Sequence, residues 1–127
     1  MAQSFLEHVN FNVADAPATA KWMCDLFGWK IRWQGPASNG GLSIHVGTDD
    51  NYLAIYTPEA PRPRHDNPRG EVANLNHVGI VVDDLDAVEA RVKAIGYTPF
   101  NHADYEPGRR FYFNDENDIE FEIVNYD

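Results

Sequence analysis

The sequence predicts an α+β fold made of two tandem βαβββ modules. Three observations predict it. A strand pattern that begins with histidine and ends with aspartate occurs twice, an amphipathic helix pattern follows each copy, and a glycine followed by an aromatic residue ends each helix pattern. The 127 residues have the length of one typical domain, so we expect residues 1–127 to form a single domain.

The two copies begin with similar segments, HVNFNVAD at residues 8–15 and HVGIVVDD at residues 77–84. Hydrophobic residues occupy every second position in both, which is the period of a β-strand. This alternation places His8 and His77 on the open face of each sheet, opposite the helix. The residues expected to pack on the helix are Val9, Phe11 and Val13 in the first copy, and Val78, Ile80 and Val82 in the second.

Each strand pattern leads into a helix pattern with hydrophobic residues three or four positions apart. Asp15 is placed to cap the first helix, and Asp86 with Glu89 has the spacing of a capping box in the second. Gly28 and Gly96 suit the left-handed residue that ends a helix. The expected hydrophobic stripes are Ala16, Ala20, Met23 and Phe27, and Leu85, Val88, Val92 and Ile95.

After each glycine, runs of β-branched and aromatic residues separated by turn residues predict three further strands. These runs lie near residues 30–34, 42–46 and 52–56 in the first copy, and near 98–101, 109–113 and 119–124 in the second. The modules therefore span approximately residues 4–57 and 75–127. Residues 58–74 form a proline-rich connector that suits neither a helix nor a strand.

The last strand pattern carries two glutamates, Glu120 and Glu122, on the face opposite its hydrophobic residues. The repeat distinguishes them. Glu122 follows Gly96 by 26 residues (122 − 96), and the residue 26 positions after Gly28 (28 + 26) is Ala54. Ala54 has hydrophobic neighbours on both sides, as Glu122 does. Glu122 is therefore the better counterpart in the repeat.

Three of the four equivalent positions carry side chains that bind metals, namely His8, His77 and Glu122, and the fourth is Ala54. Two neutral imidazoles and one carboxylate form a facial set that leaves open positions on one divalent ion, such as Fe, Mn, Ni or Zn. Taken alone, each side chain is more simply explained as structural or solvent-exposed. Their shared place in the repeat favours a metal.

Composition excludes several classes of partner. The formal net charge is −10, from 20 acidic and 10 basic residues, which disfavours nucleic acid and acidic membrane surfaces. No segment has the pattern of a signal peptide or a membrane span, so we expect a cytoplasmic protein. Cys24 is the single cysteine, which leaves histidine and carboxylate side chains as the ligands for a metal.

These segments resemble the vicinal oxygen chelate superfamily, which includes glyoxalase I, extradiol dioxygenases, fosfomycin-resistance thiol transferases and bleomycin-resistance proteins. The resemblance covers nearly the whole chain. It is carried by HVNFNV at residues 8–13, LFGW at 26–29, LNHVGIVV at 75–82 and FYFNDENDIEFEIV at 111–124. Aligning Asp115 with the first residue of the superfamily's Asp-Pro-Asp-Gly turn again implies Glu122 as the ligand.

Two positions depart from the superfamily pattern. The turn at residues 115–118 lacks the usual proline and glycine, although Asn117 tolerates a left-handed conformation. Ala54 stands where glyoxalase I is expected to carry a fourth ligand. The resemblance therefore implies a three-ligand branch, like the extradiol dioxygenases or the thiol transferases.

The resemblance implies curved mixed sheets around a metal-binding cleft, and the open-face positions then predict the other residues of this cleft. Tyr112 resembles a substrate-contacting tyrosine of the superfamily, His45 is a candidate proton shuttle and Glu120 is a candidate general base. The ordinary alternatives are a cross-strand aromatic residue and solvated side chains. The candidate substrate-binding residues are Asn10, Asn12, Tyr56 and Arg110. Arg110, or Arg62, Arg64 and Arg69 of the connector, suits a substrate carboxylate or phosphonate.

The leading functional hypothesis is a glyoxalase- or dioxygenase-like metalloenzyme whose divalent metal binds vicinal oxygens of a small-molecule substrate. Alternatives are a lactoylglutathione-lyase-like enzyme and a metal-free drug-sequestering protein like the bleomycin-resistance members. Short proteins of this resemblance usually form homodimers, in which the site lies within one chain or is shared between two.

Overall fold

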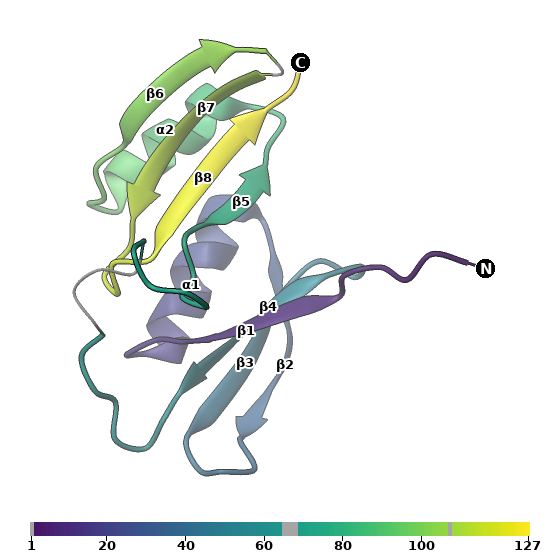
Figure 1. The fold of residues 1–127 in the computed structure, drawn as a ribbon, viewed down its shortest axis with the longest axis vertical. Coiled ribbons are helices and arrows are strands. Elements are labelled where there is room, and N and C mark those ends of the chain that lie inside the picture. Colours follow the sequence, from purple (N-terminus) through teal and green to yellow (C-terminus); the bar gives the residue numbers. More distant parts are fainter. Residues whose placement is uncertain (1, 65–68, 107) are drawn as a thin grey trace. The chain divides into compact units, whose positions relative to one another are not determined.

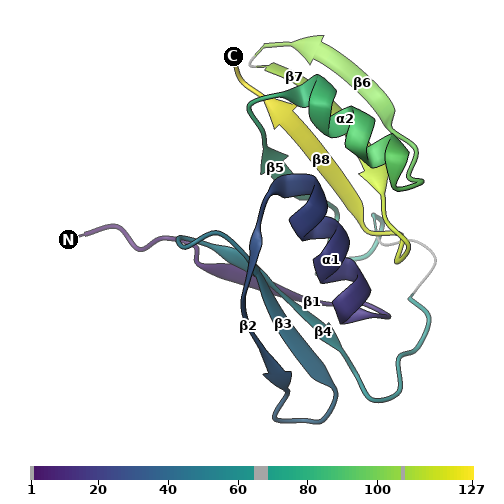
Figure 2. The same ribbon diagram turned by 180° about the vertical axis from the view of Figure 1, so that it is seen from behind.

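The computed structural model describes residues 2–64, 69–106 and 108–127, so part of the expected connector, residues 65–68, lies outside the described residues. The chain divides into two compact units, Met1–Arg62 and Pro63–Asp127. Each unit contains one βαβββ module, with a helix on one face of a four-stranded sheet (Figures 1 and 2). No helix among the described residues is long and apolar enough to span a membrane.

The first unit has the strand order β1-β4-β3-β2, in which β1 pairs with β4 in parallel and the other pairs are antiparallel. The last strand of the module therefore lies in the centre of the sheet, next to the first. The elements are β1 (His8–Asn12), α1 (Ala16–Phe27), β2 (Lys30–Pro36), β3 (Leu42–Gly47) and β4 (Tyr52–Thr57).

The second unit repeats this arrangement in the order β5-β8-β7-β6, again with a parallel first pair. The predicted α+β fold of two tandem βαβββ modules is therefore confirmed. The elements are β5 (Val78–Val81), α2 (Leu85–Ala94), β6 (Phe100–Tyr105), β7 (Gly108–Asn114) and β8 (Glu120–Asn125). The strand expected near residues 98–101 begins two residues later and extends to Tyr105.

The core of each unit lies between the helix and the sheet, as the alternation predicts. Ile44, Val46 and Ile55 are fully buried in the first unit, and Phe111, Phe113, Phe121 and Ile123 are fully buried in the second. Val9 is an exception, because its side chain is 39% exposed although it was expected on the helix side. Its strand lies at the edge of the sheet, whereas α1 packs over β2, β3 and β4.

Side-chain caps define the helix starts. Asp15 accepts a hydrogen bond from the Ala18 amide at 3.1 Å, as predicted. In α2 the predicted cap was wrong, because Asp84 accepts from the Ala87 amide at 3.0 Å. Asp86 lies in the first turn, where its carboxylate pairs with Arg109 at 3.0 Å. The predicted left-handed glycines are present after both helices, with φ of 70° at Gly28 and 100° at Gly96.

The turn between β7 and β8 is organised by Asp115, whose side chain is largely buried. Its Oδ1 accepts from the backbone amides of Asn117 at 2.9 Å and Ile119 at 3.0 Å. The left-handed residue of this turn is Asp118, with φ of 59°, and not Asn117 as the sequence suggested. These bonds set the start of β8, the strand that carries Glu122.

Replacing Asp115 with alanine is expected to lower the free energy of unfolding by about 1–3 kcal/mol, since two amides of a buried turn would lose their acceptor. Chemical denaturation measures the change. Asp50→Ala, in the exposed turn between β3 and β4, is the control and should change stability by less than about 0.5 kcal/mol. Equal effects of the two substitutions would contradict this account of the turn.

Candidate metal and substrate site

The pairing of the strands gives the two sheets equivalent positions at the candidate site. Within the parallel pairs, Asn10 lies opposite Ala54 and Gly79 lies opposite Glu122. Asn10 and Gly79 each follow a repeat histidine by two residues. Ala54 and Glu122 therefore occupy the same place in the two sheets, as the count along the sequence predicted.

The neighbouring strands extend this equivalence. His45 on β3 lies opposite Ala54, and Tyr112 on β7 lies opposite Glu122. His45 and Tyr112 are thus counterparts, and Tyr52 is the counterpart of Glu120 because each precedes the central position by two residues. Both copies point these side chains to the sheet face opposite the helix, so each unit carries the equivalent set of positions on its own open face.

His77 and Glu122 come together within the second unit. The His77 Nε2 atom lies 3.2 Å from Oε1 of Glu122. The other ring nitrogen, Nδ1, lies 2.7 Å from Oδ1 of Asn76, which accepts its hydrogen. Because Nδ1 donates to Asn76, Nε2 is the nitrogen that faces the carboxylate. It forms an ion pair with Glu122 when the ring is protonated, and otherwise it presents a lone pair that a metal ion could share with Oε1.

The spacing of these donors fits a shared metal ion. Metal bonds of about 2.0–2.2 Å at ordinary angles hold neighbouring donor atoms roughly 2.8–3.6 Å apart, and the observed separation is 3.2 Å. Gly79 leaves space beside the pair, since a Cβ built there would meet only Glu122 Oε1, at 3.9 Å. The donor types and their distance therefore suit a divalent ion on the open face of β8.

His8 in the first unit has the same local arrangement. Its Nδ1 atom lies 3.0 Å from Oε1 of Glu7, the residue before it, just as Asn76 precedes His77. A side chain that holds Nδ1 orients the ring and leaves Nε2 as the metal-binding atom. We did not expect this role for Glu7 and Asn76 from the sequence. The signal was a polar residue directly before each repeat histidine.

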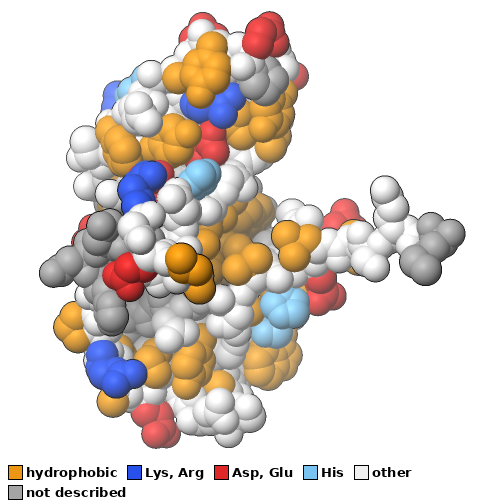
Figure 3. Space-filling model, in the orientation of Figure 1, with side chains coloured by type: hydrophobic (Ala, Val, Ile, Leu, Met, Phe, Trp, Pro, Cys, Tyr) orange, Lys and Arg blue, Asp and Glu red, His pale blue; other side chains and the backbone are white. Residues whose placement is uncertain are grey.

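Neither unit by itself, over the part of the chain that the structure describes, gathers three histidine, cysteine or acidic side chains in a metal-binding group. His77 and Glu122 belong to the second unit and His8 to the first. A three-ligand site therefore requires both units, from one chain or from two. Figure 3 shows histidine side chains at the surface of each unit.

The second oxygen of Glu122 is held by two side chains of β7. Arg110 Nη1 donates to Oε2 at 2.8 Å, and the Tyr112 hydroxyl donates to the same oxygen at 3.2 Å. The Arg110 and Glu122 side chains are only 13% and 14% exposed. Burial, followed by the negative charge of Glu122, raises the pKa of Tyr112, so its hydroxyl remains a donor at neutral pH. Glu122 is thus oriented with Oε1 directed at His77.

Glu120, the candidate base, is ion-paired with Arg69 of the connector. The glutamate side chain is largely buried while the arginine is mostly exposed. Arg64, also from the connector, donates to the carbonyl groups of Asn117 and Asp118 in the turn before β8. Arg64 and Arg69 of the connector are therefore engaged within the second unit, and the Glu120 carboxylate is neutralised by its ion pair with Arg69.

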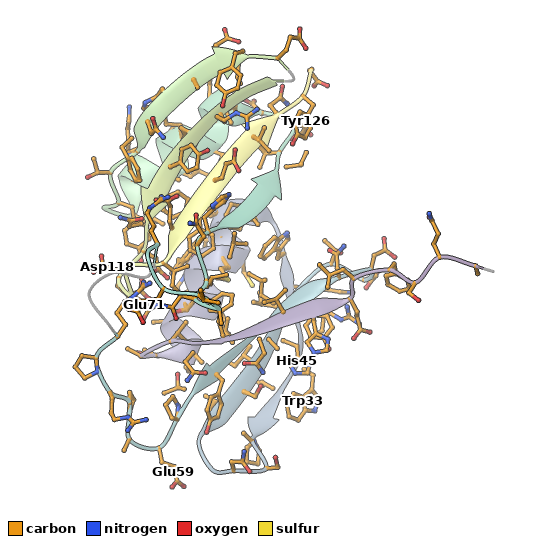
Figure 4. All side chains as sticks on the ribbon, viewed as in Figure 1. Trp33, His45, Glu59, Glu71, Asp118 and Tyr126 are labelled. Carbon is orange, nitrogen blue, oxygen red and sulfur yellow. The ribbon has the colours of Figure 1, made fainter. Side chains whose placement is uncertain are left out.

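The first unit presents aromatic rings where the second presents charges. Tyr52 stacks between His8 and His45, with ring centroids 4.9 Å and 4.7 Å away. Trp33 continues the row at 5.1 Å from His45, and Figure 4 shows the two side chains together. The Arg32 guanidinium lies 4.4 Å from the Tyr52 ring centre. His8, Tyr52, His45 and Trp33 thus form a row of rings, and this aromatic row includes His45, the cross-strand neighbour of Ala54.

The remaining candidates divide into exposed and engaged residues. Asn10 and Asn12 on β1 are exposed. Tyr56 is half-buried, and its hydroxyl donates to the Gly40 carbonyl at 2.8 Å, which fastens the loop between β2 and β3. Tyr56 therefore has a structural role in this unit in addition to its place on the open face.

Comparison with known proteins identifies the family. The profile of the Glyoxalase/Bleomycin resistance protein/Dioxygenase superfamily matches residues 5–123. The chain belongs to this superfamily. No curated protein matches the sequence.

Several solved structures share the fold. A glyoxylase/bleomycin resistance protein/dioxygenase domain from Frankia sp. EAN1pec has 19% identity and a TM-score of 0.81, over 99% of this chain and 100% of that one. The genomically encoded fosfomycin resistance protein FosX from Listeria monocytogenes has 18% identity and a TM-score of 0.72, over 98% and 94%. TnmS3, an antibiotic binding protein from Streptomyces sp. CB03234, has 17% identity and a TM-score of 0.73, over 100% and 99%.

The position of His45 in the aromatic row of the first unit predicts that its ring is weakly basic. Its burial, followed by the electrostatic influence of His8 and then by the positive charge of Arg32, lowers the pKa of His45 from its ordinary value. Arg32→Gln removes the arginine charge, so the pKa of His45 is expected to rise, as measured by NMR titration of the ring protons. In the unfolded chain His45 takes up its proton at a higher pH than in the folded protein. The free energy of unfolding therefore falls as pH decreases below about 6.5. An unchanged pKa in the variant would exclude the proposed effect of Arg32.

Proposed function

We propose that this protein is a metalloenzyme in which His8, His77 and Glu122 hold one divalent ion, of Fe, Mn, Ni or Zn, that binds vicinal oxygens of a small substrate. The observation that carries the proposal is the approach of His77 Nε2 to Glu122 Oε1 at 3.2 Å, with Nδ1 occupied by Asn76. Two unshared donor atoms at this distance have the arrangement of ligands to a common ion.

Ala54 favours a branch with three protein ligands. It occupies the register position of Glu122 in the other sheet and has no donor atom. The proposal therefore leans toward extradiol-dioxygenase-like or thiol-transferase-like chemistry. A lactoylglutathione-lyase-like reaction would need another group in place of the missing ligand.

The bound ion would supply Lewis acidity at adjacent substrate oxygens. Asn76 and Glu7 hold the two histidine rings in the tautomer that binds metal. Arg110 and Tyr112 fix the carboxylate of Glu122 through its other oxygen. These contacts preorganise the donors before the substrate arrives, which reduces the reorganisation that binding requires.

Proton transfer is assigned to two residues. The pKa of His45 is lowered chiefly by its burial, with a further contribution from the charge of Arg32, so the neutral ring can accept a proton. Glu120 becomes a second acceptor when its ion pair with Arg69 opens. The exposed position of Arg69 makes this opening possible without disturbance of the buried sheet.

A second candidate is a metal-free binding protein that sequesters a small molecule. The Arg110–Glu122 ion pair favours it, because the pair neutralises the buried carboxylate without a metal. Metal uptake separates the two candidates.

The metalloenzyme is expected to take up close to one equivalent of Mn(II), Fe(II), Ni(II) or Zn(II) per complete site, and His77→Ala is expected to weaken that binding at least tenfold. Calorimetric titration of untagged protein measures both. The matched control is His102→Ala. His102 also pairs with a glutamate in the second unit, with Nε2 2.9 Å from Glu89 Oε2, and its loss should leave the affinity unchanged.

Uptake below about 0.1 equivalent of every ion would contradict the metalloenzyme and leave the binding protein. Normal affinity in His77→Ala would show that another site holds the metal. Oxygen consumption with catechols and thiol-dependent turnover then test the two preferred reaction classes.

We also propose a homodimer, which light scattering is expected to detect. Mixing His8→Ala and His77→Ala subunits tests whether the site is shared between chains. A shared site restores one intact ligand set in each mixed dimer, whereas a site within one chain restores none. Recovered tight metal binding after subunit exchange would establish sharing, and a monomeric protein would contradict the dimer.

A further inference from the structure

Arg110 has hydrogen-bonding capacity that the protein does not use. Its Nη1 donates to Glu122, but Nε and Nη2 are buried and have no hydrogen-bond partner among the described residues. A guanidinium group carries five N–H donors, and leaving them unpaired in a buried place costs free energy. An arrangement of this kind on the open face of a sheet calls for an acceptor that a ligand supplies.

The residues directly opposite Arg110 on the neighbouring strands offer no side-chain acceptor. Its cross-strand neighbours are Ala103 on β6 and Val124 on β8, both without polar side chains. The ring of Tyr105 stacks on the guanidinium at 4.9 Å, and this tyrosine is 59% exposed at the end of β6. Displacement of the Tyr105 ring, which is not fixed in the core, therefore uncovers the unpaired nitrogens.

Three other arginines of this unit already have hydrogen-bond or ion-pair partners. Arg69 binds Glu120, and Arg64 donates to two turn carbonyls. Arg109, the residue beside Arg110, pairs with Asp86 at 3.0 Å on the opposite side of β7. Arg110 differs from these three in two respects. Two of its nitrogen atoms are buried without a partner, and its guanidinium lies beside the His77–Glu122 pair.

We infer that Arg110 binds an oxyanion of the substrate, a carboxylate or phosphonate, and that a metal ion on Glu122 strengthens this binding. The second part rests on the proposed function. In the metal-free protein Glu122 neutralises Arg110. A cation that binds Glu122 compensates the carboxylate charge, so the charge of Arg110 becomes available to an anion. The coupling is reciprocal, and the anion raises metal affinity by the same factor.

The test measures the affinity for methylphosphonate or acetate by calorimetric titration, with and without Zn(II). In the proteins that keep Arg110, NMR also follows its side-chain Nε–H signal during the titration. The zinc-loaded protein is expected to bind the anion at least tenfold more tightly than the metal-free protein. Arg110→Gln is expected to lose at least tenfold in anion affinity while zinc still binds. Arg109→Gln is the matched control and should behave as the unaltered protein does.

Equal anion affinity in Arg110→Gln would mean that the anion binds the metal alone, which overturns the inference. Equal affinity with and without zinc, in protein that binds zinc, overturns it as well.

An experiment without metal distinguishes this inference from the proposed function. Glu122→Gln removes the carboxylate charge without a metal, so metal-free Glu122→Gln is expected to bind acetate at least fivefold more tightly than the unaltered metal-free protein. The gain should vanish in the double variant with Arg110→Gln. If no zinc binds, the proposed function fails, and this comparison still decides the role of Arg110. Absence of the gain would overturn that role.

Discussion

The parallel pairing of the first and last strands of each module is the constraint on which the site depends. It places residue 79 opposite residue 122 in one sheet and residue 10 opposite residue 54 in the other. Because parallel strands need a long crossover, the helix and two strands between them are the connection that makes this contact possible. The pairing brings His77 to Glu122 across 45 residues of sequence (122 − 77).

The same framework carries different chemistry in its two copies. Around Ala54 the first unit places stacked rings of Tyr52 and His45. Around Glu122 the second unit places Tyr112 and Arg110, which hold the carboxylate by hydrogen bonds. A buried carboxylate needs hydrogen-bond donors that compensate its loss of water, whereas an alanine side chain needs none. The difference between Glu122 and Ala54 therefore accounts for the different neighbouring side chains.

The fold and the counterpart of Glu122 could be predicted because both depend on periodicity, which a sequence displays directly. Local alternatives were harder to separate. Asp84 and Asp86 are both good helix caps, and the choice depends on where α2 begins and on Arg109, which pairs with Asp86 from a distant strand. Val9 follows the strand alternation correctly, but its exposure depends on which strands the helix covers.

Contacts between side chains from distant parts of the chain could not be predicted from the spacing of residues in the sequence. Glu120 was a plausible free base in the sequence, yet a connector arginine neutralises it in the structure. Similarly, Arg110 and Glu122 are twelve residues apart (122 − 110), and their ion pair follows from the turn at Asp115 and the register that it sets. Such pairs depend on rotamers and loop paths, which tertiary packing decides.

The Arg110–Glu122 ion pair does not compete with a metal for the same atom. Arg110 and Tyr112 use Oε2, whereas Oε1 lies 3.2 Å from His77. The carboxylate can therefore keep its hydrogen bonds while its other oxygen becomes a ligand. The ion pair compensates the buried charge of Glu122, and in the proposed metal-bound state it would also orient the ligand. This contact accounts for a buried glutamate at the position without any ion, and it would remain compatible with one.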